Sequence, residues 1–264
     1  MRCRNKICIM LTACVNPNGM AYTALQNVDE RELQYRNALL FYLCMTDAPI
    51  VFVENTCSDF SADYRKYIDS NRLEYITFEG NNYDKNLGKG YGEALLIKEA
   101  FKRSRFLKES KYVVKITGRL VIRNIQQGLS SRLLCINHLF RADLRERVHL
   151  WTTLFVIETK MLKTIIDQNI ETINDSKGFF FEHAIYNGLI KDKSVKLIPF
   201  IHETKVEGVS GTVAGRTYAS LMSKFQIQDN LYFTSLFYKE AGHKCTSLVW
   251  SVIYRIYLLY KRII

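Results

Sequence analysis

The sequence predicts an α/β fold with an open, mainly parallel sheet, helices on both faces and an amphipathic helix at the C-terminal end. Strand-like and helix-like patterns alternate over the first 122 residues, which is typical of a parallel sheet with right-handed crossovers. A chain of 264 residues, 48% of them apolar, can fill a full core. Only 3 prolines and 13 glycines are present, so no linker is indicated. We expect one domain over residues 1–245 and a separate basic, aromatic helix over 246–264.

The first half of the chain supplies the expected parallel sheet. Hydrophobic periodicity distinguishes its strands from its helices. Strands are expected at 6–13, 49–55, 73–80 and 111–122, and helices at 29–45, 61–70 and 90–107. After residue 122 we expect helices at 125–140, 160–175 and 178–192, strands at 149–159 and 194–201, and a glycine-rich loop at 202–218.

The cysteines and the N-terminal residues indicate a reducing, cytoplasmic setting. The 7 cysteines are odd in number and none forms a C-x-x-C pair, which supports neither a zinc ribbon nor a disulfide framework. The apolar run in "MRCRNKICIMLTAC" is short and stops at "VNPNGM". We therefore expect a first strand there and not a signal peptide.

The net charge of +11 predicts an anionic partner: nucleic acid, anionic lipid or a phosphorylated substrate. A merely solvated basic surface is the alternative. The chain has no helix-turn-helix signature, no RNP aromatic pair and no zinc knuckle, so nucleic acid is not the expected partner. A basic α/β module that binds nucleic acid stays open as an alternative function.

The segment "NLGKGYGEALLIKEA" places three glycines before a long helix. Gly88, Gly90 and Gly92 would let the backbone approach a ligand closely, and the helix start would attract an anion. Gly90 stands where a P-loop needs Ser or Thr, and the first strand has no Rossmann glycines. The motif is therefore neither of these two nucleotide-binding signatures.

The order of these motifs resembles a GT-A glycosyltransferase. The resemblance rests on "ICIMLTA", "VFVENTCSD", "N-x-G-K-G-x-G-E" before a helix, a further strand and a later "FFFEHA", and it covers roughly residues 6–200. It implies a nucleotide-sugar donor and a lipid-linked or polysaccharide acceptor in bacterial surface glycan synthesis. A nucleotidyltransferase on the same fold is an alternative. The donor-binding residues it implies are Thr12, Asn55, Asn86, Gly88, Lys89, Lys115, Thr117 and Gly118.

The sequence departs from the family where the fourth strand ends. The family carries an Asp-x-Asp there that holds a divalent metal, whereas this chain has Thr117-Gly118-Arg119 and no Asp-x-Asp anywhere. No metal ligand and no cofactor is therefore predicted, although a divalent metal stays open. We expect Arg119, with Lys115 or Lys89, to stabilise the leaving phosphate in place of the metal. A capping or ion-pairing role for Arg119 is the alternative.

The segment "GFFFEHAIY" supplies the candidate base. The resemblance implies that Glu182 deprotonates the acceptor hydroxyl of an inverting enzyme, beside His183. A carboxylate favoured only by the helix dipole is the alternative. In the following loop, His202 and Arg216 are candidates for contact with the acceptor or a phosphate.

The C-terminal residues 247–264 predict a helix at an anionic membrane surface. Ser251, Arg255 and Arg262, with Lys261 beside them, form a polar strip. The expected apolar face carries Trp250, Tyr254, Tyr257 and Leu258. The central Arg255 argues against a transmembrane span, and a core helix is the alternative. The expected location is peripheral, at the inner face of the cytoplasmic membrane.

Overall fold

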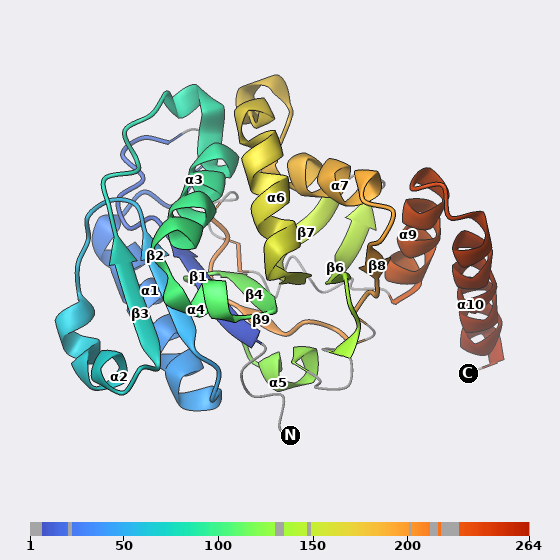
Figure 1. Cartoon of the computed structure of the whole chain (residues 1–264), viewed down its shortest axis with the longest axis horizontal. Helices are drawn as coiled ribbons and strands as arrows, with labels where there is room; N and C mark the ends of the chain where they lie inside the picture. The colour runs from blue at the N-terminus through green and yellow to red at the C-terminus, as the bar shows by residue number, and fades with distance from the viewer. Residues whose placement is uncertain are drawn as a thin grey trace.

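The computed structural model describes residues 7–20, 23–129, 135–146, 149–200, 202–211, 216–217 and 227–263. Within them, a seven-stranded sheet has the order β3-β2-β1-β4-β7-β6-β8 (Figure 1). Its strands are β1 (Ile7–Ala13), β2 (Ile50–Glu54), β3 (Leu73–Thr77), β4 (Tyr112–Thr117), β6 (Leu139–Glu146), β7 (His149–Glu158) and β8 (Lys196–Leu197). A second, two-stranded sheet pairs β5 (Val121–Ile122) with β9 (Val206–Glu207).

The sheet is parallel where the sequence predicts it to be. β1 lies between β2 and β4, and β2 pairs with β3, all in parallel. β7 runs antiparallel to both β4 and β6, while β6 and β8 are parallel. The predicted open, mainly parallel α/β sheet is therefore confirmed, and β7 adds two antiparallel pairings to it.

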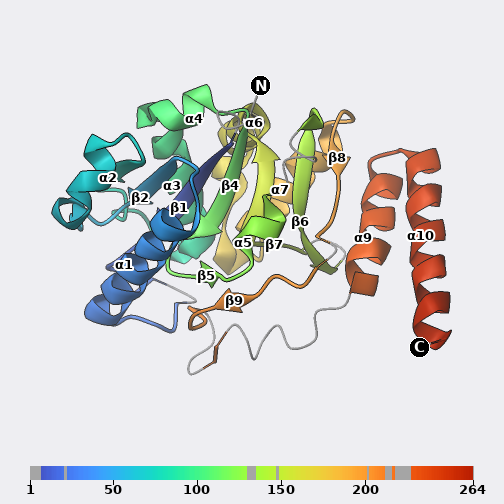
Figure 2. The ribbon, with the colours of Figure 1, turned by 90° about the horizontal axis from the view of Figure 1, so that it is seen from below.

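Helices cover both faces of this sheet (Figures 1 and 2). One face packs against α1 and α5, and the other packs against α3, α4, α6 and α7. The helices are α1 (Val28–Met45), α2 (Arg65–Asp69), α3 (Gly88–Arg103), α4 (Arg105–Glu109), α5 (Ile125–Gly128), α6 (Thr159–Asn169), α7 (Phe181–Lys191), α9 (Ile227–Glu240) and α10 (Lys244–Ile263). Short 3-10 turns occupy Ser61–Tyr64, Lys85–Leu87, Ile170–Thr172 and Asp175–Lys177.

Coverage on both faces explains the apolar character of the central strands. In β1, Ile9 and Leu11 point into the core on the α1 side, while Cys8 and Met10 point into the core beneath α3. All four side chains are fully buried. A strand buried on both faces reads as a continuous apolar run, which is why "ICIMLTA" is recognisable in the sequence.

Register brings three strand ends to one edge of the sheet. Thr12 of β1 lies beside Thr117 of β4, and Ala13 lies beside Glu54 at the end of β2. Parallel strands present their carboxyl ends at a common edge, where open α/β sheets bind ligands. The chain leaves the sheet at this edge into the loops that form the pocket described below.

The predicted helix over 125–140 is wrong. α5 ends at Gly128, and β6 begins at Leu139, with residues 130–134 outside the described part of the chain. The expected strand over 194–201 shortens to β8. The helix α9 has no counterpart among the predicted elements.

Helices α9 and α10 form a hairpin at the edge of the molecule beyond β6 (Figure 2). Ser251 shares a hydrogen bond of 2.6 Å with Ser235 of α9, and the Tyr254 ring lies 5.5 Å from that of Tyr232. The sequence predicted Tyr254 on the membrane-facing apolar side of the helix and Ser251 on its basic strip. Both predictions are wrong, because both side chains face α9. In the described residues, none of the helices has the length and apolar character needed to cross a membrane.

Candidate functional site

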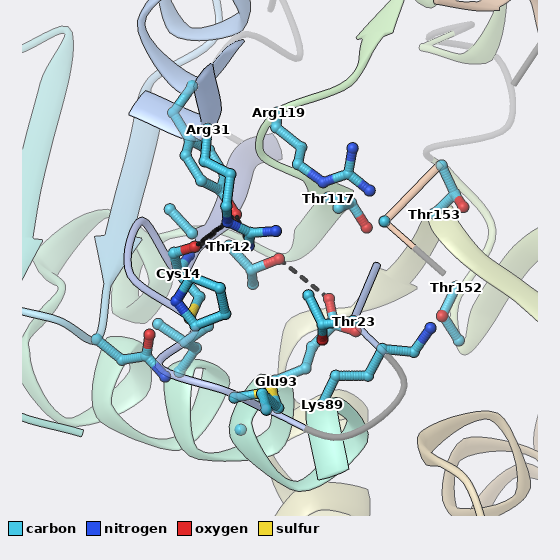
Figure 3. Close-up of a pocket in the computed structure, with 18 of the residues that line it drawn as sticks. Thr12, Cys14, Thr23, Arg31, Lys89, Glu93, Thr117, Arg119, Thr152 and Thr153 are labelled. Carbon is cyan, nitrogen blue, oxygen red and sulfur yellow. Dashed lines mark hydrogen bonds between the residues drawn. The ribbon is translucent and has the colours of Figure 1, made fainter. Parts of the chain in front are cut away.

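A pocket opens at the edge where β1, β2 and β4 end (Figure 3). The loops after these strands, the start of α3, strand β7 and the start of α7 all contribute side chains. Its lining residues are Thr12, Ala13, Cys14, Pro17, Met20, Thr23, Arg31, Tyr35, Asn55, Lys89, Gly92, Glu93, Leu96, Thr117, Arg119, Thr152, Thr153, Glu182 and Gly211.

Asn55 is a buried amide without a hydrogen-bond partner in the described structure. It is 1% exposed, and neither Oδ1 nor Nδ2 has a partner. The neighbouring Glu54 carboxylate fixes the surrounding loops, accepting from the backbone N–H groups of Val15 at 3.1 Å, Thr56 at 2.8 Å and Ser58 at 3.0 Å. A buried, unpaired polar group costs free energy, which a ligand carrying a donor and an acceptor would remove.

Arg119 is held over the pocket by the segment after β9. Its guanidinium is nearly buried and donates to the Val209 carbonyl oxygen. A Cβ atom on Gly211 would lie 2.6 Å from a guanidinium nitrogen, so a larger residue there would displace the guanidinium. The strand-end arginine is therefore a positioned cation that lines the cavity.

Arg31 and Tyr35 of α1 line the pocket and are absent from the predicted site. Arg31 donates to the Cys14 carbonyl oxygen at 2.9 and 2.6 Å and to the Leu25 carbonyl oxygen at 3.1 Å. The Tyr35 hydroxyl accepts from the Cys14 N–H at 3.0 Å. These contacts shape the loop after β1. Burial also raises the pKa of the Cys14 thiol to about 11, which keeps it neutral near pH 7.

An ion pair between a buried lysine and a partly exposed glutamate supports one wall of the pocket. The Lys115 ammonium of β4 is fully buried and pairs with Glu93 of α3. Glu93 also accepts a hydrogen bond of 3.0 Å from the Thr12 hydroxyl, which Figure 3 shows. Lys115 supports the pocket from behind and does not line it, and Glu93 was not predicted from the sequence.

The same lysine connects to the candidate base. The Lys115 ammonium donates to the Thr152 carbonyl oxygen at 2.7 Å. The Thr152 hydroxyl donates to the Glu182 carboxylate at 2.7 Å. Glu182 lies in the first turn of α7, on the wall of the pocket. Its carboxylate is therefore oriented by β7 in addition to the helix start.

The glycines at the start of α3 accommodate a carboxylate of the protein itself. Asp175 accepts from the Gly90 N–H at 3.2 Å, and Cβ atoms on Gly88 or Gly90 would lie 2.3 or 2.8 Å from its oxygens. Burial raises the pKa of Asp175 above its usual value. The start of α3, which the sequence predicts to bind a ligand anion, therefore contacts the carboxylate of Asp175. Lys89 in the same turn lines the pocket.

The structure brings six of the predicted residues to one pocket. They are Thr12, Asn55, Lys89, Thr117, Arg119 and Glu182. Gly118 lies directly beside it, and its N–H donates to the Thr12 carbonyl oxygen at 2.8 Å.

Other predicted residues do not line the pocket. Asn86 is exposed and hydrogen-bonds Asp84, while Gly88 packs on Asp175. His183 accepts a hydrogen bond of 3.0 Å from the Phe180 N–H and so caps α7. The remaining two, His202 and Arg216, are exposed.

The pocket carboxylates do not form a metal site. In the residues that the structure describes, no three His, Cys, Asp or Glu side chains cluster in a way that could hold a metal ion. Of the two carboxylates that line the pocket, Glu93 is paired with Lys115 and Glu182 accepts from Thr152. This donor set does not fit a divalent cation, which prefers several free oxygen ligands.

Comparisons with known proteins concern the fold. No protein-family model and no curated protein matches the chain. Among solved structures, S. aureus TarS 1-349 in complex with UDP has a TM-score of 0.44 at 10% identity, with 89% of this chain and 65% of that chain covered. The mannosyltransferase Ktr4p from S. cerevisiae has a TM-score of 0.47 at 10% identity, and the match covers 86% of this chain and 81% of that chain. The inositol-1-phosphate CTP transferase from T. maritima has a TM-score of 0.47 at 13% identity, and the match covers 87% of this chain and 98% of that chain.

Proposed function

We propose that the chain is a glycosyltransferase that moves a sugar from a nucleotide-sugar donor to a hydroxyl acceptor. The observation that carries this proposal is the composition of the pocket. One cavity at the strand ends is lined by the unpaired Asn55 amide, the cations Arg119 and Lys89, and the carboxylate of Glu182. An amide, positive charge and a base are the groups that a nucleoside, a diphosphate and an acceptor hydroxyl require.

The residues divide the reaction between them. Glu182 takes the proton of the acceptor hydroxyl, whose oxygen forms the new bond to the anomeric carbon. The bond from that carbon to the donor phosphate oxygen breaks, and the nucleotide leaves with the bonding electrons. Arg119 and Lys89 stabilise the charge that develops on the leaving phosphate. Attack from the face opposite the leaving group inverts the anomeric centre.

The acceptor belongs to the same proposal. We take it to be a lipid-linked or polysaccharide glycan of a bacterial surface, glycosylated by a peripheral protein at the inner face of the cytoplasmic membrane. The net charge of +11 supports an anionic donor and an anionic membrane alike.

Product analysis tests the proposed reaction. The protein is incubated with UDP-, GDP- and CMP-sugars and with lipid-linked or oligosaccharide acceptors, and the products are identified by mass spectrometry. We expect an acceptor heavier by one sugar and one equivalent of free nucleotide. A parallel incubation supplies a nucleoside triphosphate and a sugar phosphate; release of pyrophosphate there would instead identify a nucleotidyltransferase.

A further inference from the structure

We propose that the outward face of α10 docks on an anionic lipid surface. Seven of the twelve exposed large apolar side chains in the described part of the chain lie on this helix, each 38–67% exposed. Their spacing places them on one side of the helix, since each residue advances the helix by about 100°. They are Leu248, Val249, Val252, Ile253, Ile256, Leu259 and Tyr260.

Contacts with α9 fix the rotation of α10. Ser247 donates to the Ser235 carbonyl oxygen at 2.9 Å, and Ser235 donates to the Ser247 carbonyl oxygen at 3.1 Å. Both serines are buried. Close pairing of small residues leaves no room for the helix to roll, so the apolar face points away from the protein. Figures 1 and 2 show α10 at the outer edge of the molecule, with α9 between it and the sheet.

Positive charge borders this apolar face. α10 contains Lys244, Arg255, Lys261 and Arg262 and no carboxylate side chain. Lys244 and Arg255 are exposed, and helical geometry places them within about 20° of each other, next to Leu248 and Leu259. A helix in a membrane interface buries its apolar face at the acyl boundary while basic residues meet anionic headgroups.

The charge pattern favours lipid over a second copy of the chain. Symmetric pairing through this face would bring the basic border of one α10 toward that of its partner. With no carboxylate on the helix, like charges would face one another unneutralised. An anionic bilayer supplies the opposite charge and an apolar layer at once.

Vesicle co-sedimentation of the full chain tests this docking, with phosphatidylcholine vesicles compared with vesicles that also contain phosphatidylglycerol. We expect binding to the anionic vesicles that added salt weakens. Ile256→Ser with Leu259→Ser should weaken it at least about tenfold, since two large apolar side chains no longer enter the bilayer. Arg255→Glu should weaken it by roughly tenfold as well.

The matched control is Leu33→Ser with Leu40→Ser, which removes two exposed leucines from α1. We expect this variant to bind vesicles as the wild type does. Because the α10 side chains are exposed, the thermal midpoint of Ile256→Ser with Leu259→Ser should stay unchanged. A large fall in that midpoint would assign the face to the protein core and overturn the proposal.

Two further outcomes would also overturn it. One is vesicle binding that the α10 and α1 variants retain equally. The other is a wild-type dimer in light scattering that Ile256→Ser with Leu259→Ser dissociates, without any vesicle binding, which would make a second copy the occupant. The inference does not rest on the proposed reaction, because sedimentation is measured without donor and Arg119→Ala should leave it unchanged.

Discussion

Arg119 defines the pocket at the scale of single residues. It lies just after Gly118 at the end of β4 and is anchored by the Val209 carbonyl oxygen, so its charge stays at the strand ends. The sequence identified Arg119 as unusual and Glu182 as a candidate base. It could not identify Glu93 or Thr152, because their contacts with Lys115 and Glu182 join residues 22 to 37 positions apart. Such partners follow from the fold and leave no local pattern.

Glu182→Gln tests the proposed base. The amide keeps the shape and can still bond Thr152, but it cannot take the acceptor proton. We expect kcat to fall by roughly two to four orders of magnitude, with donor affinity little changed. Steady-state kinetics beside donor titration separate the two effects. Glu171→Gln, at an exposed position, is the control, and near-normal turnover of Glu182→Gln would reduce Glu182 to a helix-terminus role.

Arg119→Ala tests the cation at the strand end. We expect donor binding to weaken by about 1–3 kcal/mol, the typical range for one charged hydrogen bond. Calorimetric titration in EDTA measures it, and wild-type binding should survive the chelator. Arg123→Ala is the control, since Arg123 is exposed and pairs with Glu207. Binding that disappears in EDTA and returns with Mn²⁺ would contradict the metal-free account.

Asp175→Asn tests the carboxylate buried at the start of α3. Its folded pKa is raised, so the folded state holds the proton more tightly than the unfolded state does. Its contribution to stability is therefore lost as pH rises from the ordinary value of 3.8 through the raised one. Relative to Asp175→Asn, the wild-type free energy of unfolding should fall over that window. Urea unfolding of both proteins from pH 3 upward measures the difference, and a difference independent of pH would contradict the raised pKa.

At the scale of elements, apolar strands were predictable and charged strands were not. β1, β2, β3 and β4 are recognisable because helices cover both faces and most inward positions are apolar, with the buried Lys115 and Glu54 as exceptions. β6 carries Arg141 and Asp143, which read as solvent-facing. In the fold both are buried: Asp143 accepts from Thr204 at 2.9 Å and Asn230 at 3.1 Å. Distant residues thus satisfy the Asp143 carboxylate, while the two charged residues hide the strand from local patterns.

Gly88→Ala tests the junction between α3 and Asp175. Gly88 has φ of 81° and ψ of −175°, a region open almost only to glycine, and its Cβ would collide with Asp175. We expect a loss of more than about 3 kcal/mol in the free energy of unfolding. Gly178→Ala is the control, since Gly178 is left-handed with φ of 74° but has open space around it. That variant should lose about 1–2 kcal/mol. Equal losses in urea unfolding would contradict the packing of Asp175 on this turn.

At the scale of the whole molecule, the pocket and the exposed face of α10 are separate features of one chain. The pocket lies where β1, β2 and β4 end, whereas α10 lies beyond β6 (Figure 2). If α10 docked on a membrane, the pocket would not be part of the contact, because the ends of the sheet strands form it. The sequence predicted both features, but it assigned the outward face of α10 to the wrong residues, because it could not show which side meets α9.

The proposed function requires the pocket to bind nucleotide sugars, and a panel of thermal-shift measurements detects such binding. UDP-, GDP- and CMP-sugars are compared in EDTA with single-stranded oligonucleotides, using the wild type, Asn55→Ala and the control Asn82→Ala, which changes an exposed asparagine. We expect one class of nucleotide sugar to raise the thermal midpoint of the wild type and of Asn82→Ala, and to do so far less for Asn55→Ala. Stabilisation by oligonucleotides alone, or by a nucleotide sugar equally in all three proteins, would contradict the account.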